Sequence, residues 1–311
     1  QKRPRTIQIF LPTGDPAGIR IAEQTTSIIR LIEVPRSDIA EFVKMPEAKQ
    51  VGLYFLVSGD NTYTDNDELY IGQSGDVGSR LMQHYKDEKK DWERALVLVS
   101  LTNNLTQTHV LYLESLSIEK AKHCQRYELL NGNGGQKPHT PVPLKADCDE
   151  IHEIGSLLLA TLGYPVFEPL TETSPTKAEQ VFSCSRTGVD AKGIYTNEGM
   201  VVLKGSSAPM STKRKTEQRF YDKRDQLLAK GVIAEKGGRF VFQRDYLFPT
   251  PSGASMFLLL ASSNGWVEWK TEHGVTLHDH QGRTLESASE QGNTHSDMQI
   301  TSSVGFPIKD D

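Results

Sequence analysis

The alternation of apolar and polar residues predicts a chain that begins with short strands and continues with strands and helices together. The segment 51–57 is almost continuously apolar, which is typical of a central strand, and 68–72 and 95–101 are its predicted partners. These elements predict an α+β fold. Stretches with apolar residues at helical spacing predict amphipathic helices over 76–85, 106–130 and 151–162.

Breaks rich in glycine, proline and small polar residues divide the predicted elements into domains. Residues 131–143 end one block, and 167–177, rich in Pro, Thr and Glu, end a second. In the last part of the chain we expect a basic helix over 216–230 and a closing hairpin arm at 264–270. The expected organisation is a β-rich N-terminal segment (1–48), a first domain (49–135), a linker with one helix (136–180), an α+β domain (181–272) and an acidic, poorly ordered tail (273–311).

Composition limits the classes of protein to which this chain can belong. The chain is 37% hydrophobic and 24% charged, and no apolar run reaches the roughly 18 residues of a membrane helix, so we expect no membrane partner. Cys124, Cys148 and Cys184 are scattered without a CxxC pair, which predicts a cytoplasmic location with neither a zinc site nor disulfides. The net charge is −5, but residues 181–270 carry 14 basic and 8 acidic side chains, a net +6.

Five polar residues of the first domain stand out by type and spacing. Tyr54 and Tyr70 occupy matching points of two predicted strands, and Arg80 and His84 are i and i+4 on the next helix, so they share one face. Glu114 lies on an apolar stripe of the following helix, where a carboxylate costs on the order of several kcal/mol unless a cation or charged partner compensates it.

Each of these residues also has a purely structural interpretation. A strand tyrosine commonly packs in the core, Arg and His on a helix commonly form a solvated face, and a buried Glu commonly pairs with a nearby Arg or Lys. The order and spacing of all five residues together favour a functional site.

Residues 50–133 resemble the GIY-YIG nuclease superfamily. The first triplet departs from the family only by Leu for Ile, and the polar loop 58–67 makes the gap between the triplets wider than usual. The family also has an Asn after the Glu, for which Asn131 is our candidate and Asn133 the alternative. The resemblance is carried by Gly52-Leu53-Tyr54, Tyr70-Ile71-Gly72, Gln73-Ser74, Arg80, His84 and Glu114.

The resemblance implies a small three-stranded antiparallel sheet flanked by helices and the hydrolysis of nucleic-acid phosphodiesters with one divalent metal ion, Mg²⁺ or Mn²⁺. It implies that Glu114 holds the metal and that Tyr54 activates the attacking water, directly or through a relay. Arg80 would face the scissile phosphate, where its guanidinium can stabilise developing charge. A phenol has a pKa near 10, so Tyr54 needs a nearby metal or Arg to act as a base.

Three further residues receive supporting roles from the same resemblance. Tyr70 and His84 would shape the hydrogen-bond network around the attacking water. Gly72, which lacks a Cβ, would let the backbone approach the phosphate.

The C-terminal region resembles an uncharacterised domain found behind nuclease and methylase modules in prokaryotic restriction-associated proteins. The resemblance is carried by residues 199–206, 249–255 and 264–269, and it implies no activity. One helix and the residues before it are basic, and they form either a surface for DNA phosphates or a solvated face. The basic residues are Lys213, Arg214, Lys215, Arg219, Lys223 and Arg224.

Three functions follow from the sequence. The leading hypothesis is a metal-dependent DNA endonuclease in defence against foreign DNA or in repair, because all five catalytic positions are filled. The second is a nucleic-acid-binding module that no longer cuts, which the 8 basic and 12 acidic side chains of residues 51–135 favour slightly. The third is a structural adaptor acting through the tail. The sequence leaves DNA versus RNA, the target and the oligomeric state open.

Overall fold

The computed structural model describes residues 3–58, 67–87, 91–132, 138–170, 180–186, 188–211 and 218–282. The fold is α+β, as expected, and the chain divides into two compact units, Gln1–Pro169 and Leu170–Asp311. None of the helices in these ranges is both long and apolar enough to cross a lipid bilayer.

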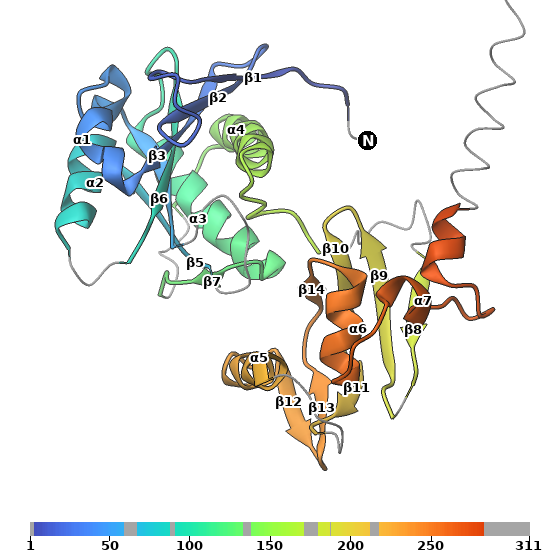
Figure 1. Ribbon diagram of the computed structural model, residues 1–311. Helices are drawn as coiled ribbons and strands as arrows, with labels where there is room; N and C mark the ends of the chain where they lie inside the picture. Colours follow the sequence, from blue (N-terminus) through green and yellow to red (C-terminus); the bar gives the residue numbers. More distant parts are fainter. Residues whose placement is uncertain are drawn as a thin grey trace, which may run out of the picture. The chain divides into compact units, whose positions relative to one another are not determined.

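A seven-stranded sheet with helices on both faces forms the first unit (Figure 1). The order across the sheet is β1-β2-β3-β6-β4-β5-β7, and neighbours are antiparallel except β5 and β7. Its strands are β1 (Ile7–Phe10), β2 (Arg20–Gln24), β3 (Ile29–Pro35), β4 (Gly52–Val57), β5 (Glu68–Ser74), β6 (Arg94–Ser100) and β7 (Glu128–Leu129). Its helices are η1 (Arg36–Asp38), α1 (Ile39–Phe42), η2 (Pro46–Lys49), α2 (Val77–Lys86), α3 (Gln107–Cys124) and α4 (Val142–Thr161).

The three strands expected in the first domain are the middle of this larger sheet. β6, β4 and β5 are adjacent and antiparallel. The segment 1–48 is not a separate lead-in, because β3 pairs with β6 along its whole length. The helix expected in the linker, α4, packs on the same sheet through Leu158 and Leu159. The structure therefore joins residues 1–169 in one unit, where the sequence predicted three segments.

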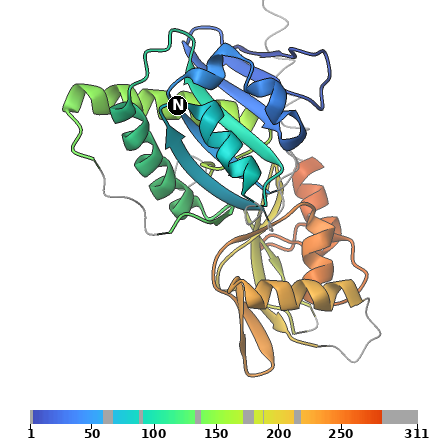
Figure 2. The ribbon, with the colours of Figure 1, turned by 90° about the vertical axis from the view of Figure 1, so that its left-hand side faces the viewer.

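Side-chain alternation along the strands gives the sheet two apolar faces. Phe55 and Leu98 belong to the core beneath α3 and α4, whereas Tyr54 and Leu56 belong to the core beneath α1 and α2. The ribbon in Figure 2 shows these helix layers from a second direction. A strand covered on both faces has no polar side, which explains the continuous apolar run over residues 51–57.

Three expected elements have different bounds or types in the structure. The helix expected over 106–130 ends at Cys124, because Gln125 takes a left-handed conformation with φ of 51° and the chain then forms β7. The helix expected over 151–162 begins earlier, at Val142. The hairpin arm expected at 264–270 contains the short helix α7 instead, whose first turn is capped by the Asn264 side chain.

The second unit contains a four-stranded and a three-stranded sheet with helices packed on them. Leu277 is fully buried in its core, so the packed domain continues past the boundary expected at 272. The rest of the expected tail, from residue 283, lies outside the described residues. The elements are β8 (Val181–Cys184), β9 (Ala191–Thr196), β10 (Gly199–Val202), β11 (Ser207–Pro209), α5 (Gln218–Ala229), β12 (Ile233–Lys236), β13 (Arg239–Phe242), β14 (Tyr246–Phe248), α6 (Pro251–Leu259) and α7 (Gly265–Glu268).

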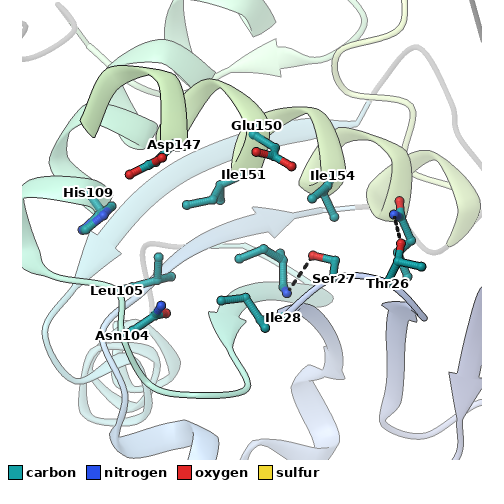
Figure 3. Close-up of a pocket in the computed structure, with 12 residues that line it drawn as sticks. Thr26, Ser27, Ile28, Asn104, Leu105, His109, Asp147, Glu150, Ile151 and Ile154 are labelled. Carbon is teal, nitrogen blue, oxygen red and sulfur yellow. Dashed lines mark hydrogen bonds between the residues drawn. The ribbon is translucent and has the colours of Figure 1, made fainter. Parts of the chain in front are cut away.

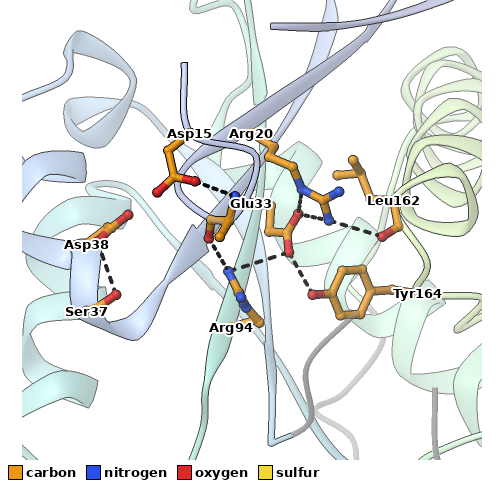
Figure 4. Close-up of polar contacts among 9 residues, drawn as sticks. Asp15, Arg20, Glu33, Ser37, Asp38, Arg94, Leu162 and Tyr164 are labelled. Atoms are coloured by element: carbon orange, nitrogen blue, oxygen red, sulfur yellow. Dashed lines mark hydrogen bonds and ion pairs between the residues drawn. The ribbon is translucent and has the colours of Figure 1, made fainter. Parts of the chain in front are cut away.

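A buried carboxylate ties the N-terminal strands to the rest of the first unit (Figure 4). Glu33, in β3, is only 1% exposed. Its Oε2 accepts a hydrogen bond of 2.5 Å from Arg20 Nε, and its Oε1 accepts one of 2.8 Å from the Tyr164 hydroxyl. Arg94 Nη1 lies 4.0 Å from Oε1. One carboxylate thus joins β2, β3, β6 and the chain after α4, and its charge is compensated by both arginines.

Replacing Tyr164 with Phe should lower the free energy of unfolding by about 1–3 kcal/mol, because a buried carboxylate oxygen loses a donor while the ring remains. Urea denaturation measures the change. Tyr85→Phe is the matched control, since Tyr85 is 44% exposed. Equal stability of the two variants would show that the Tyr164 hydroxyl does not stabilise the fold.

Candidate active site

Two tyrosines on neighbouring strands form the floor of the candidate site. Tyr54 of β4 is opposite Gly72 of β5, and Tyr70 is opposite Leu56, so the tyrosines are diagonal neighbours and not directly opposed as the sequence suggested. Their ring centroids lie 6.3 Å apart. Both side chains lie on the face of the sheet that α2 covers.

Gly72 has a direct steric reason to be glycine. A Cβ at this position would lie 2.4 Å from both Cζ and the hydroxyl oxygen of Tyr54, which is far inside van der Waals contact. The Tyr54 phenol therefore occupies the space that a side chain at Gly72 would fill. This reason differs from the expected approach of a phosphate, which stays a prediction.

Helix α2 brings two further predicted residues to the tyrosines. Asp76 caps the helix by accepting a hydrogen bond of 2.8 Å from the Ser79 N–H. One turn apart, Arg80 and His84 both reach the Tyr54 hydroxyl. His84 Nε2 lies 2.8 Å from it, and Arg80 Nε donates to it at 3.3 Å.

The environment of Tyr54 opposes ionisation. The side chain is fully buried, and burial raises its pKa to about 12, although the hydrogen bond from Arg80 acts in the opposite direction. The same hydrogen bond raises the pKa of Arg80. In this structure the phenol is therefore protonated at neutral pH.

Glu114 joins the site from α3. It is half-buried, and burial raises the pKa of its carboxyl group against the opposing charge of Arg80. The Glu114 charge also acts on Tyr54. Within the described residues, no hydrogen bond or ion pair to the Glu114 carboxylate is formed. The structure thus brings all five predicted catalytic residues together, from β4, β5, α2 and α3.

A metal at this site would have one protein carboxylate. The described residues contain no group of three or more His, Cys, Asp and Glu side chains placed to hold a metal. Mg²⁺ retains several waters and is commonly held by one or two carboxylates together with substrate phosphates. An unpaired, half-buried Glu114 fits that mode of binding and does not fit a closed protein cage.

Asn131 supports the site through the backbone of β5. Its Oδ1 accepts from the Ile71 N–H at 2.9 Å, and its Nδ2 donates to the Ile71 carbonyl at 2.7 Å. These bonds extend the parallel pairing of β5 with β7 by one position, between Tyr70 and Gly72. The alternative candidate, Asn133, lies outside the described residues.

Gln83 was not singled out from the sequence. Its Oε1 accepts a hydrogen bond of 2.9 Å from Arg80 Nη1. The i, i+3 spacing of the two residues on one helix is the signal that could have found this contact.

Arg224 was assigned wrongly to the DNA-facing set. It is only 1% exposed, and its guanidinium donates to the carbonyls of Pro209, Met210, Phe257 and Leu258 at 2.6–3.2 Å. It also stacks on the Phe240 and Phe257 rings. Burial lowers its pKa to about 10. Arg224 therefore holds the core of the second unit together.

The other five members of the basic set have two outcomes. Arg219 is exposed on α5, Lys223 is half-buried there, and each has a cation–π contact with an aromatic ring. Their role in DNA binding stays a prediction. Lys213, Arg214 and Lys215 lie outside the described residues.

A separate cavity of about 430 Å³ lies between the β2–β3 turn, the start of α3 and α4 (Figure 3). Asp147 and Glu150 on α4 and His109 on α3 lie around it, together with Ile151 and Ile154. It contains none of the five predicted catalytic residues. Its acidic side chains make it a poor receptor for a phosphate.

Comparison with known proteins adds one relationship. The model of a family described as a domain of unknown function (DUF4357) matches residues 182–281. No curated protein and no solved structure matches the chain. The match coincides with the described part of the second unit and is compatible with the uncharacterised C-terminal domain that the sequence suggested, whose link to restriction-associated proteins stays a prediction.

Replacing Asn131 with Ala should speed amide hydrogen exchange at Ile71, because both backbone groups of Ile71 lose their partner. We expect a local loss of about 1–3 kcal/mol in protection. Hydrogen exchange followed by NMR measures it, and Leu98, whose strand β6 pairs with β3 and β4, is the internal control. Unchanged protection at Ile71 would contradict this role of Asn131.

Tyr54 should titrate about two pH units above an ordinary phenol. Because its pKa in the folded protein, about 12, exceeds the usual value of 10.0, the stability gained from its protonated form is complete below pH 10 and is lost as the pH rises through 12. Ultraviolet absorbance of the phenolate in wild type and Tyr54→Phe isolates this step, and Tyr85→Phe should retain it. If Tyr54→Phe instead loses an absorbance step near pH 10 relative to wild type, Tyr54 titrates as an ordinary phenol and the raised pKa is refuted.

Proposed function

We propose that the first unit is a metal-dependent endonuclease that hydrolyses phosphodiester bonds of DNA, in restriction and defence or in repair. The observation that carries the proposal is the direct hydrogen bonding of Tyr54 to both His84 and Arg80, with the unpaired carboxylate of Glu114 within electrostatic reach. A nucleophile activator, a charge clamp and a cation ligand around one point are what in-line attack on phosphorus requires.

The proposed proton path begins at the attacking water. As the water oxygen forms its bond to phosphorus, the water proton passes to the Tyr54 oxygen, and the phenol proton passes to His84 Nε2, 2.8 Å away. His84 carries out this step as the neutral tautomer with Nε2 unprotonated. The phenol is therefore never required to exist as a free phenolate, which its pKa of about 12 disfavours.

The second half of the reaction is charge stabilisation and bond cleavage. Arg80 faces the phosphate and stabilises the negative charge that develops on its oxygens. The bond from phosphorus to the leaving sugar oxygen breaks, and that oxygen takes a proton from solvent. His84 then returns the proton that it accepted to solvent, which restores its neutral form. A divalent cation on Glu114 supplies electrostatic polarisation of the phosphate when bound.

One observation favours the second hypothesis, a nucleic-acid-binding module that no longer cuts. The Tyr54 side chain is fully buried, and its hydroxyl is already engaged by His84 and Arg80. A water that gives its proton to Tyr54 would have to reach this buried hydroxyl. The adaptor hypothesis depends on the tail beyond residue 282, which lies outside the described residues.

Glu114→Gln and Arg80→Ala should each reduce cleavage of plasmid and single-stranded DNA in Mg²⁺ or Mn²⁺ by about 100-fold or more, because each removes a charge that acts on the transition state. The decline should appear in kcat as well as in kcat/KM. Glu119→Gln is the matched control, since Glu119 lies on the same helix and is exposed.

Each outcome of this experiment separates the hypotheses. Equal cutting by wild type and both variants would rule out this site. A wild type that binds DNA without cutting any substrate would support the binding module. The same assay on single-stranded RNA decides between the two kinds of nucleic acid.

A further inference from the structure

A groove of about 410 Å³ lies beside α2, on the side where η2 packs against it, and Val43, Ala48 and Met82 make much of its lining apolar. Close packing sets its floor, because a Cβ at Gly78 would lie 2.8 Å from Ala48 Cβ. The polar side chains around the groove are those of Lys49 from η2, Asp76 just before α2, and Ser79, Gln83 and Lys86 from α2.

Gln83 connects this groove to the candidate active site. Arg80 donates through Nη1 to Gln83 Oε1 at 2.9 Å and through Nε to the Tyr54 hydroxyl at 3.3 Å. Because the Gln83 oxygen is engaged by Arg80, its amide N–H groups are the donors left for a ligand. The groove and the site are thus adjacent parts of one surface.

The groove is positively charged within a unit that is otherwise acidic. Lys49 and Lys86 are both exposed, and neither forms an ion pair with another described residue. Of the nearby carboxylates, Glu47 pairs with Arg30, whereas Asp76 lines the groove and accepts a hydrogen bond from the Ser79 N–H. The two lysines and Asp76 together give the groove a net charge of +1. Two lysine ammonium groups and an amide donor are the groups that bind phosphate oxygens without reading bases.

We propose that this groove binds the backbone phosphate next to the one that Arg80 faces, on the same strand of the nucleic acid. The inference rests on the proposed function of the Tyr54 site and adds to it a second phosphate position. Lys49 and Lys86 supply charge, and Gln83 fixes the distance between the two phosphates by bonding to Arg80. The groove would add affinity for the strand beside the phosphate that reacts.

The test compares Lys49→Gln/Lys86→Gln with Lys122→Gln/Lys145→Gln, a control pair of exposed lysines on α3 and α4. Binding of a fluorescent oligonucleotide is measured in EDTA over a series of NaCl concentrations. If both lysines contact phosphate, the slope of log K against log salt should fall by about 1.4 for single-stranded and about 1.8 for double-stranded DNA. In Mg²⁺, KM should rise with kcat little changed.

Lys49→Arg/Lys86→Arg keeps the charge and should keep the wild-type slope, which separates loss of charge from a folding defect. An unchanged slope in Lys49→Gln/Lys86→Gln would overturn the groove proposal while Glu114-dependent cleavage stood. An equal fall of the slope in Lys122→Gln/Lys145→Gln would also overturn it, because the effect would then come from the net charge of the protein and not from the groove. A wild type that neither binds nor cuts would overturn the proposed function together with this inference.

Discussion

The structure of the candidate site depends on one contact, the Tyr54 phenol lying over the Cβ-free position of Gly72. A Cβ at Gly72 would collide with the phenol whose hydroxyl meets both His84 and Arg80, so any larger residue there would displace the ring. The contact requires the register that places Tyr54 opposite Gly72, and a slip of one residue would turn every side chain of β4 to the other face. The site is therefore fixed by the central sheet itself.

The site also depends on the position of α2, the helix that carries Arg80 and His84. The Val77 N–H donates to the Gln50 carbonyl at 3.2 Å, and Gly78 lets the helix pack directly on Ala48. The first turn of α2 is thus held against η2 before the helix reaches Arg80. Both hydrogen bonds to the phenol then come from residues one turn apart on this helix.

The sequence could predict what local pattern and spacing determine. The strands β4 and β5 and the helix α2 follow from periodicity, and the five candidate residues were found from their spacing together with the resemblance to a nuclease family. It could not predict that β3 pairs with β6, because that pairing joins segments about 65 residues apart and leaves no local mark. The carboxylate of Glu33, which anchors this region, looked like any strand Glu.

Arg224 shows the same limit in the second unit. Its helix is basic, and a charged residue on such a helix is usually solvated. Its partners are carbonyls of β11 and of the last turn of α6, whose unpaired C-terminal carbonyls attract a cation. Backbone acceptors carry no signal in the sequence, so a structural arginine of this kind is indistinguishable from a DNA-binding one until the fold is known.

Arg80 and Arg224 are the same side chain in opposite circumstances, and the contrast bears on the proposed chemistry. Arg224 is buried among backbone carbonyls that cannot move away. Arg80 is partly exposed and bonds to the fixed phenol of Tyr54 and to the exposed side chain of Gln83, so the guanidinium is the group that can move. Its guanidinium has more N–H donors than these contacts use, so it can begin to bind a phosphate before it releases the phenol. An exchange of that kind would open the Tyr54 oxygen to water only when substrate is present. In the absence of substrate, burial of the phenol would prevent proton transfer between Tyr54 and water.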